Sequence, residues 1–348
     1  MKRIISLTLP IALCSNQLLA KEERELIVLA SALHKSTYYE DVRSEIMEFH
    51  IEYAKKISQS DNVLIFTDKH QYPEYVKYLG KEKVIIAPML DIWMRDFTLS
   101  NTTNPIMFRY TPEGQGGGKK AQSRSDAVQE QFAEIITDAG LSFLETDLLN
   151  DGGNIVDDYA GNIVVSRKFL RDNSITENEG RKRLRKFPGI KNVAFIDVEP
   201  GEIGQGKLEH ADGIVSFIDK NTLMVNTYPD SRKYSQKLKK DLRQGLPGVK
   251  IHEIVTPYNG SKVYDKKFGS ACGLYTNALV TPNRIYFPQF GIPEDKVALK
   301  KVRSISSREV IPVKSSQVCH MGGGVRCMSW QLRGKNAKAL LKYFKKNK

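Results

Sequence analysis

One cysteine near the end of the chain, Cys327, has the surroundings that a reactive thiol needs. Three glycines, Gly322 to Gly324, come shortly before it, and glycine lets a backbone turn tightly or approach a ligand closely. A neighbouring positive charge lowers the pKa of a thiol and makes it a better nucleophile, and Arg326 or a bound cation would supply that charge. A buried structural cysteine is the alternative. A metal site of Cys319, His320 and Cys327 is a weaker one, because it lacks a fourth ligand at a sensible spacing.

A histidine and two aspartates are further candidates for chemistry. His210 and Asp212 would point to the same face of an extended chain, where one could carry protons and the other hold a cation. A local pair that only satisfies itself at a strand end is the alternative. Asp96 follows Trp93 and is either a turn or helix-cap residue or the second of two carboxylates facing a planar cation. Two carboxylates would select a guanidinium over a simple amine, because its N–H groups form a fixed fork that matches them.

These residues belong to four short clusters at or near the ends of apolar runs, where loops carry function. The clusters are residues 93–96, 150–154, 209–213 and 321–327. A glycine-rich segment, residues 113–120, superficially resembles a phosphate loop, but its glycine spacing is wrong and no Ser or Thr follows its lysine. We interpret it as a loop that moves over a site.

Strand-like and helical patterns alternate along the chain, which predicts an α/β or mixed α+β protein. The strand-like runs are 26–29, 63–66, 84–87, 162–166, 193–197, 214–217, 222–226, 274–280 and 284–287. Helical periodicity fits 39–57, 125–139, 176–186, 231–243, 293–304 and 337–344. No long Pro- or Ser-rich linker separates them, so we expect one domain over residues 21–348.

The chain begins with features of an export signal. A basic start, a short apolar core and Ala20 before a charged stretch predict a signal peptide over residues 1–20 and a secreted or periplasmic protein. A lipoprotein cysteine at position 14 and a buried first strand are the alternatives. Removing the signal leaves Cys272, Cys319 and Cys327, an odd number. Either Cys272 and Cys319 form a disulfide and Cys327 is free, or all three are separate buried thiols.

The formal net charge of +13 arises largely from clusters of lysine and arginine. Such a surface attracts polyanions without a dedicated site, but solvated helix faces and a charged tail are the favoured explanation. Aromatic residues do not interleave with the clusters as a nucleic-acid-binding module requires, so we expect no nucleic-acid partner. No later segment is long and apolar enough for stable membrane insertion. The sequence leaves the oligomeric state open.

Taken together and in this order, the clusters resemble the agmatine deiminase and bacterial-type peptidylarginine deiminase family, part of the guanidine-modifying (pentein) superfamily. The matching segments span most of the chain: 93–96, 151–154, 210–212, 275–277 and 322–327. The resemblance implies an α/β fold of five αβ modules around a pseudo-fivefold axis (an α/β propeller), with the active site at the centre.

The resemblance also implies roles for individual residues. Cys327 matches the nucleophile, and His210 matches the general acid/base. Asp96 and Asp212 match the carboxylates that bind the guanidinium. Further expected substrate contacts are Trp93, Asn277, Asp151 and Asn154.

Three departures from the family pattern bear on substrate choice. Many relatives have Glu-Gly-Gly where this chain has Asp151-Gly152-Gly153, and aspartate is one methylene shorter. Glu209 stands before His210 where agmatine deiminases usually have glycine. Phe97-Thr98-Leu99 replaces their usual Thr-Gly-Pro. These differences weaken agmatine as the substrate, while export favours free or peptide-borne arginine. Arg109, Arg167 and Arg171 lie in segments that could approach a substrate carboxylate.

The expected reaction needs no metal or organic cofactor. The Cys327 thiolate attacks the central guanidinium carbon, His210 protonates the leaving nitrogen, and ammonia departs from a covalent thiouronium. Water activated by His210 then releases a ureido product. One alternative is an amidinotransferase, which would pass the amidino group to an amine. Others are a non-catalytic exported protein that binds guanidinium groups or polyanions, and a papain-like protease, whose local signature is missing.

Overall fold

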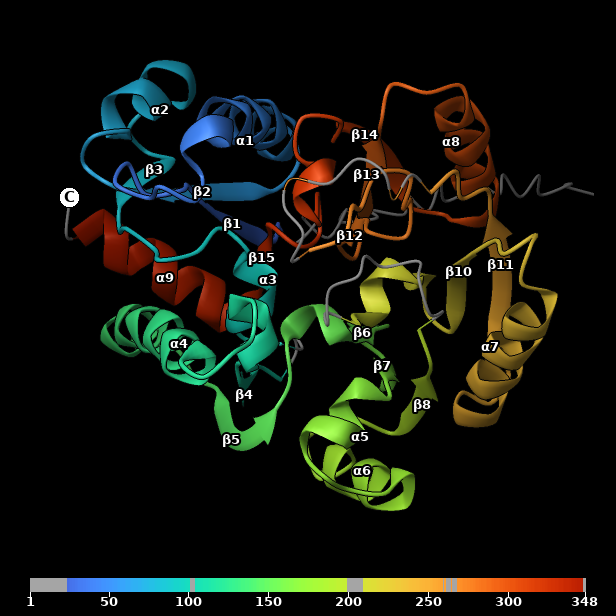
Figure 1. Cartoon of the computed structure of the whole chain (residues 1–348). Coiled ribbons are helices and arrows are strands. Elements are labelled where there is room, and N and C mark those ends of the chain that lie inside the picture. The colour runs from blue at the N-terminus through green and yellow to red at the C-terminus, as the bar shows by residue number, and fades with distance from the viewer. Residues whose placement is uncertain are drawn as a thin grey trace, which may run out of the picture.

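The computed structural model is a mixed α/β protein, as the alternating patterns in the sequence predict (Figure 1). It describes residues 24–100, 104–198, 209–258, 260, 264 and 268–346. The expected signal segment, residues 1–20, lies outside the described residues. None of the helices in these ranges combines the length and the apolarity that a bilayer-spanning segment requires.

The strands of the described residues form five small sheets. The first has the order β15-β1-β2-β3, from Trp330–Leu332, Leu26–Ala30, Asn62–Thr67 and Val84–Ile86. The second pairs β4 (Ile106–Arg109) with β5 (Leu144–Leu149). The third contains β6 (Ile155–Asp157), β7 (Asn162–Ser166) and β8 (Asn192–Ile196). The fourth has the order β11-β10-β9, from Lys250–Ile254, Thr222–Asn226 and Val215–Asp219, and the fifth β12-β13-β14, from Leu279–Val280, Arg284–Gln289 and Glu309–Lys314.

Each sheet contains a parallel pair, and helices connect the two strands because a parallel connection must cross the sheet. In the first sheet these helices are η1 (Glu40–Val42), α1 (Arg43–Ser58) and α2 (Tyr72–Leu79). In the others they are η2 (Pro112–Gln115) and α4 (Ala121–Asp138), α5 (Lys168–Asp172) and α6 (Glu177–Leu184), α7 (Arg232–Gly245), and α8 (Glu294–Ile305). The longer helices bury apolar residues, and α7 packs Leu238 and Leu242 into a core that includes β8 of the third sheet as well as β9 and β10.

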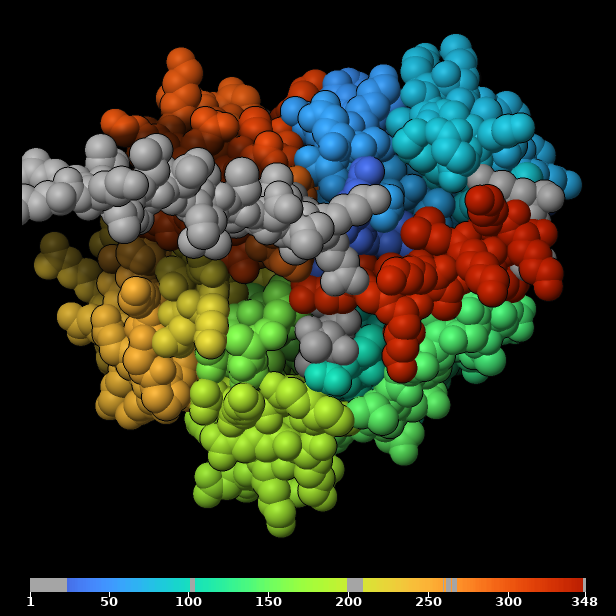
Figure 2. All heavy atoms as spheres, turned by 180° about the vertical axis from the view of Figure 1, so that it is seen from behind, coloured from blue at the N-terminus to red at the C-terminus, as the bar shows by residue number. Residues whose placement is uncertain are grey.

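The two ends of the described chain meet in the first sheet. β15 pairs antiparallel with β1, so the first and last strands are neighbours. The carboxylate of Glu25, directly before β1, accepts hydrogen bonds from Gln331 and Arg333 at 2.9 and 2.6 Å. The last helix, α9 (Gly334–Lys346), packs Leu340 into a core shared with β1 and α4. Figure 2 shows it in red, between the blue and cyan part of the molecule and the green part.

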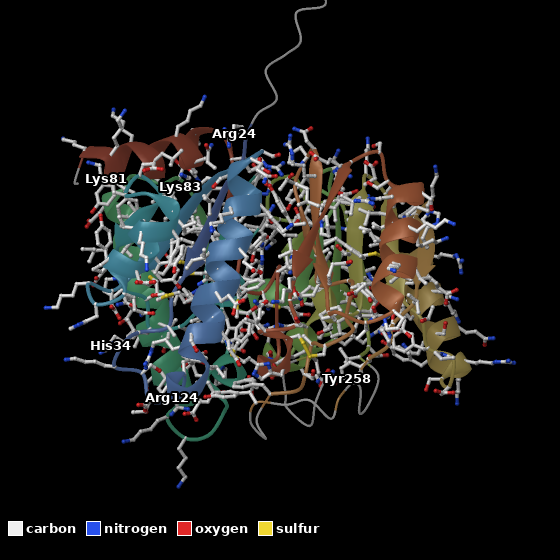
Figure 3. The ribbon with its side chains drawn as sticks, turned by 90° about the horizontal axis from the view of Figure 1, so that it is seen from above. Arg24, His34, Lys81, Lys83, Arg124 and Tyr258 are labelled. Atoms are coloured by element: carbon white, nitrogen blue, oxygen red, sulfur yellow. A yellow bond between two sulfur atoms is a disulfide. The ribbon has the colours of Figure 1, made fainter. Side chains whose placement is uncertain are left out.

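The polar clusters of the sequence lie at one end of these sheets. Residues 93–96, 151–154, 210–212, 275–277 and 322–327 follow β3, β5, β8, β11 and β14, the last parallel strand of each sheet. Arg24 and Lys83 precede strands at one end of the molecule in Figure 3, and His34, which follows β1, lies at the other end. Carboxyl ends of parallel strands gather at one edge of a sheet, where ligands of α/β proteins bind.

The prediction of a strand over residues 274–280 is wrong for most of its length. Only Leu279 and Val280 are in a strand, β12, and the preceding residues form turns. Gly273 has a φ of +88°, which only glycine adopts without strain and which interrupts an extended chain. The hydroxyl of Tyr275 donates to Asp295 at 2.7 Å, which holds the turn against α8.

Candidate active site

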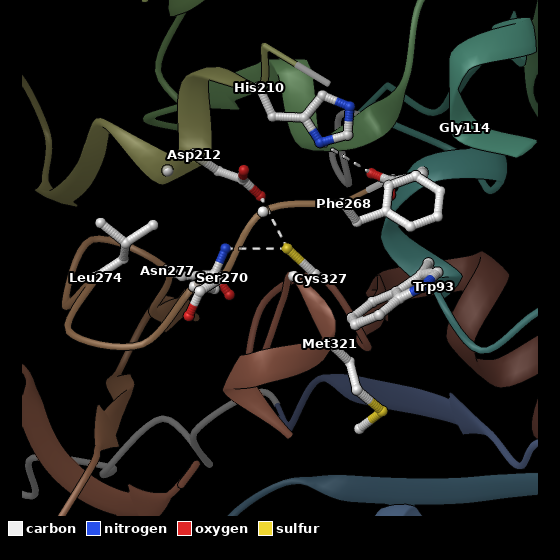
Figure 4. Close-up of a pocket in the computed structure, with 15 residues that line it drawn as sticks. Trp93, Gly114, His210, Asp212, Phe268, Ser270, Leu274, Asn277, Met321 and Cys327 are labelled. Atoms are coloured by element: carbon white, nitrogen blue, oxygen red, sulfur yellow. Dashed lines mark hydrogen bonds and ion pairs between the residues drawn. The ribbon is translucent and has the colours of Figure 1, made fainter. Parts of the chain in front are cut away.

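One pocket brings together most of the residues singled out by the sequence (Figure 4). Its lining includes Cys327, His210, Asp96, Asp212, Trp93 and Asn277. They come from the segments that follow β3, β8, β11 and β14, so four of the five sheets contribute to the pocket wall. Side chains that lie far apart in the sequence are therefore within reach of a single small ligand.

The Cys327 thiol is buried at the base of this arrangement and is not part of a disulfide. The Asn277 side-chain amide donates to Sγ at 3.0 Å, and a carboxylate oxygen of Asp212 lies 3.8 Å away (Figure 4). Burial raises the pKa of the thiol well above its usual range, and the charges of Asp212 and Asp96 add to that effect. The thiol is therefore protonated near neutral pH in the empty pocket.

Glycine is required at position 323, four residues before this thiol, because the chain packs so closely. A Cβ on Gly323 would lie 2.4 Å from the Trp93 ring and 2.8 Å from the Cys327 Cβ. The next glycine differs, since a Cβ on Gly324 would make only ordinary contacts at 3.8 Å or more. The absence of a side chain at Gly323 is what lets the indole and the thiol share one wall.

His210 is held between two carboxylates. Its Nε2 lies 2.9 Å from Asp151 Oδ2, and its Nδ1 lies 3.6 Å from Asp96 Oδ1. Burial alone would lower the pKa of His210, but Asp96, Asp151 and Asp212 outweigh that effect and raise it to about 9. The ring is therefore an imidazolium near neutral pH and can donate a proton.

The expectation that His210 and Asp212 lie on an extended chain is wrong. Residues Ala211–Gly213 form a 3₁₀ turn, η4, and only His210 at its start is extended. The turn nevertheless directs both side chains into the pocket, as Figure 4 shows. His210 and Asp212, two residues apart in the sequence, thus reach the same pocket because the chain turns between them.

Asp96 lies in the short helix α3 (Met94–Phe97), close to the imidazolium. Burial raises the pKa of its carboxyl to about 7, although His210 opposes that shift. The backbone N–H of Gly153 donates to Oδ1 at 3.0 Å. A Cβ on Gly153 would lie 2.7 Å from this oxygen and 2.6 Å from Nδ1 of His210, so the second glycine of the Asp-Gly-Gly motif keeps acid and base together.

Asp151 and Asn154 are not among the residues that line the pocket, and their contact with substrate stays a prediction. Asp151 lies on the far side of His210 and also accepts from the backbone N–H and the hydroxyl of Thr111, at 3.0 and 2.9 Å. Asn154 accepts from the backbone N–H of Ser166 at 2.9 Å and so fixes the loop to β7. Asp151 therefore orients the His210 ring, and Asn154 orients the backbone of its loop.

Asp212 has a partner that the sequence did not predict. Arg326 Nη1 donates to Asp212 Oδ2 at 2.6 Å, and Nη2 donates to the carbonyl of Ile155 at 2.7 Å. We expected Arg326 to act on the thiol beside it, yet its guanidinium points to the carboxylate. Its position next to Cys327 in the sequence predicted that Arg326 lies near the thiol, but it could not predict the direction of the side chain.

The three arginines proposed for a substrate carboxylate are all in ion pairs and none lines the pocket. Arg109 pairs with Asp126, and Arg171 pairs with Glu209. Arg167 pairs with Asp241 at 2.8 Å and with two further carboxylates. Surface solubility and helix anchoring account for them.

The remaining pocket wall is mostly apolar and is cross-linked. Phe268, Leu274 and Met321 line it, and Gly114 of η2 reaches it from the glycine-rich segment. A disulfide joins Cys272 to Cys319, which ties the loop of residues 268–277 to η5 (Cys319–Met321). Within the described ranges, no group of three or more His, Cys, Asp or Glu side chains is arranged to hold a metal ion.

The geometry suits chemistry on a flat cation. Two carboxylates, Asp96 and Asp212, face a volume that is also bordered by a thiol and an imidazolium. A planar cation between the acids would bring its positive charge next to Cys327, and His210 would lie within reach of its nitrogens. Nucleophilic attack followed by proton transfer is what this set can perform.

A protein-family comparison supports that assignment. Residues 20–332 match the model of a family described as Porphyromonas-type peptidyl-arginine deiminase. Among curated proteins, one from Marinomonas sp., named provisionally as an agmatine deiminase, is 22% identical over 346 residues, covering 89% of this chain and 92% of that protein.

Solved structures show the same fold at low sequence identity. An agmatine deiminase of C. jejuni has a TM-score of 0.73 and 20% identity, covering 90% of this chain and 94% of that one. An agmatine deiminase of Enterococcus faecalis has a TM-score of 0.71 and 17% identity, with the same coverage.

Proposed function

Since the chain belongs to the family of Porphyromonas-type peptidyl-arginine deiminases and is a hydrolase of guanidinium C–N bonds, we propose that it converts free or peptide-borne arginine to citrulline with release of ammonia. One observation carries the proposal: the thiol of Cys327, the imidazolium of His210 and the carboxylates of Asp96 and Asp212 line a single pocket. Agmatine is the second candidate substrate.

Binding of the guanidinium activates the nucleophile. Asp96 and Asp212 hold its N–H groups, and the cation then lies beside Cys327. Its charge offsets the two aspartates that oppose ionisation of the thiol, so the pKa of Cys327 falls and its proton leaves to solvent. The thiolate fraction of Cys327 thus rises when the substrate is in place.

The thiolate forms a bond to the central guanidinium carbon and gives a tetrahedral intermediate. His210 donates its proton to the departing nitrogen, the C–N bond breaks, and ammonia leaves a thiouronium on Cys327. The neutral imidazole then takes a proton from water, and the hydroxide attacks the same carbon. The C–S bond breaks, which returns the thiolate and releases the ureido product. General acid–base catalysis of this kind contributes about 10²–10⁴-fold.

Three residues support these steps without reacting. Asp151, held by Thr111, fixes the orientation of the imidazole and favours its protonated form. Asn277 donates to the sulfur at 3.0 Å and would stabilise negative charge on it. Trp93 provides a flat wall beside the thiol for the planar cation.

We further infer the finer architecture that the resemblance implies, five αβ modules around a pseudo-fivefold axis. The support is a repeated connection. In each sheet the last parallel strand leads into a polar segment, and after β5, β8, β11 and β14 that segment leads directly into the antiparallel strand of the next sheet. Segments related in this way would converge on one centre, where the pocket lies.

We also propose that residues 1–20 direct export and that residues 21–348 form one catalytic domain. The buried Cys272–Cys319 disulfide supports an oxidising destination, because such bonds persist outside the reducing cytosol. Edman sequencing of the protein secreted by its native host, beginning near residue 21, would test this proposal. An intact amino terminus in a cytosolic fraction would contradict it.

The activity itself is tested with purified protein and four substrates. A peptide with internal arginine, a peptide with carboxy-terminal arginine, free arginine and agmatine are incubated without an amine acceptor. Ammonia and ureido product are then measured together. We expect both products from at least one arginine substrate and neither from Cys327→Ala. Absence of product from all four would overturn the proposed function, and turnover of agmatine alone would overturn the substrate. Amidino transfer only when an amine is added would indicate an amidinotransferase.

A further inference from the structure

Arg326 is a buried arginine whose side chain does not enter the pocket that holds the substrate. It is 7% exposed and lies directly before Cys327. Its backbone N–H is 3.3 Å from the side-chain and the backbone oxygen of Asn277, so the main chain at this point is fixed to the loop that also contacts the thiol.

The guanidinium of Arg326 contacts Asp212 but does not line the pocket that Asp212 lines. It borders a small second cavity together with Asp157, Tyr159 and Gln331. Asp212 lines the front pocket, and Arg326 lines only the rear cavity. Asp212 is therefore placed between the arginine of the protein and the space where the guanidinium of the substrate would lie.

We infer that Arg326 is a positioning residue for the reaction: it holds Asp212 from behind and balances part of its charge, so that Cys327 can ionise when a guanidinium binds in front. The inference rests on the proposed function. Its first support is geometric, since the 2.6 Å contact to Asp212 Oδ2 occupies the oxygen that lies 3.8 Å from the sulfur.

Charge balance gives the second support. Three buried carboxylates, those of Asp96, Asp151 and Asp212, surround one thiol and one histidine. An uncompensated Asp212 would repel a thiolate at short range. Arg326 is buried and permanently charged, and it contacts Asp212 alone of the three, so it screens the acid closest to the sulfur.

The shape of the side chain gives the third support. The guanidinium binds two acceptors at once, the Asp212 carboxylate and the carbonyl of Ile155. A lysine would keep the charge but has a single point donor and cannot reproduce this fork. The pairing thus fixes the orientation of the Asp212 carboxylate and also compensates its negative charge. Arg326→Lys keeps the positive charge but loses the fork, so this variant separates the two effects.

The test measures alkylation of Cys327 by iodoacetamide in the absence of substrate, at about pH 8.5. Below its pKa, the thiolate fraction of a thiol changes tenfold per pKa unit. We expect Arg326→Met to slow alkylation by at least about fivefold and Arg326→Lys to fall between it and the wild type. Arg308→Met is the matched control, because Arg308 pairs with Asp219 away from the pocket, and it should alkylate at the wild-type rate.

Steady-state kinetics complete the test. Arg326→Lys should raise KM for the arginine substrate and reduce kcat less, because Asp212 keeps a neighbouring charge but loses its fixed angle. If Arg326→Met unfolds at the wild-type temperature and alkylates at the wild-type rate, the inference is overturned. If Arg326→Met does not fold, the test rests on Arg326→Lys. The inference is then overturned if Arg326→Lys has the alkylation rate and the KM of the wild type. Alkylation needs no turnover, so an enzyme that forms no ureido product leaves this result readable and contradicts only the proposed function.

Discussion

Single missing side chains determine how closely the reacting groups approach one another. At Gly153 the gap admits Asp96 and His210, and at Gly323 it admits Trp93 and Cys327. At Gly152 a Cβ would lie 1.9 Å from the carbonyl oxygen of Arg95, so even the backbone uses the space. The glycines of both motifs are thus explained by contacts rather than by flexibility.

The two adjacent glycines before Cys327 make a matched pair for mutagenesis. Gly323→Ala should lower kcat by at least about tenfold and stability by about 1–3 kcal/mol, because its Cβ overlaps the indole and the cysteine. Gly324→Ala should remain close to the wild type in both, since its Cβ meets only ordinary contacts. Thermal unfolding and initial rates measure the two effects. Equal losses of kcat and stability in both variants would show that the loss comes from restricting the glycine backbone and not from overlap of the new Cβ with its neighbours.

Aspartate at position 151 reaches the histidine although it is shorter than the family's usual glutamate. The 2.9 Å contact to His210 Nε2 shows that the shorter side chain reaches the ring, and Thr111 holds the carboxylate in place. The sequence alone left the role of Asp151 open because neither the path of the backbone nor the partner at Thr111 is visible in the motif.

Asp151→Asn should lower kcat by roughly 10- to 100-fold, a part of the acid–base contribution. Losing one of the carboxylates that stabilise the imidazolium lowers the pKa of His210 from its raised value of about 9. The alkaline limb of the pH profile of kcat should therefore move to lower pH. Thr111→Val is the control, since it keeps the charge and should shift the limb much less. A limb that stays in place in Asp151→Asn would show that His210 is not the acid.

The same contact links folding stability to pH. The folded-state pKa of His210, about 9, lies above the value of about 6.5 of an unfolded histidine. Its stabilisation is therefore fully present below about pH 6.5 and is lost as the pH rises through about 9. The difference in Tm between wild type and Asp151→Asn should accordingly be larger at about pH 6 than at about pH 9.5. A difference independent of pH would contradict this pairing.

At the scale of the elements, the sequence predicted the strands inside the sheets, β1, β2, β7, β10 and β13, and missed several edge strands. β7 and β10 have the predicted bounds, because continuous apolar runs mark strands that are covered on both faces. β5 and β11 were not predicted, and the structure shows why. Their side chains are mostly exposed or half-buried, so only backbone pairing to one neighbour defines them. Hydrophobic pattern carries no signal for such strands.

The disulfide belongs to this scale because it joins two walls of the pocket. In the Cys272→Ala, Cys319→Ala double variant we expect a loss of about 2–4 kcal/mol of stability, since a cross-link spanning 47 residues restricts the unfolded chain. KM should rise more than kcat falls, because Phe268 and Leu274 lie on the loop that is released. Urea unfolding with and without reductant measures the first effect. Reductant should destabilise the wild type and leave the variant unchanged, and an equal response in both would contradict the assignment.

For the whole molecule, the family motifs located the reacting residues but not their surroundings. Cys327, His210, Asp96 and Asp212 could be named from short matches in the right order, and the structure brings all four to one pocket. The pairing of Arg326 with Asp212 could not be predicted, since it joins residues 114 positions apart. Contacts of this kind depend on how the sheets pack, which no local pattern records.

Glu25 connects the two ends of the described chain and makes stability depend on pH. Burial raises the pKa of its carboxyl to about 7, although Arg333 and Gln331 oppose the shift. The folded protein therefore keeps a proton that the unfolded chain releases near pH 4.3, and stability is lost as the pH rises from about 4.5 to about 7. In Glu25→Gln, a mimic of the protonated form, Tm should change less over this window. The exposed Glu134→Gln should follow the wild type, and a wild-type slope in Glu25→Gln would contradict the role.

The pairing of β1 with β15 also decides when the molecule can finish folding. Because the order is β15-β1-β2-β3, a growing polypeptide presents β1 as an unsatisfied strand edge until its last strand has been synthesised. Cys327, the proposed nucleophile, lies only three residues upstream of that strand. Completion of the sheet and arrival of the reactive sulfur are thus nearly simultaneous, so partly made chains would be vulnerable to aggregation yet harmless as catalysts.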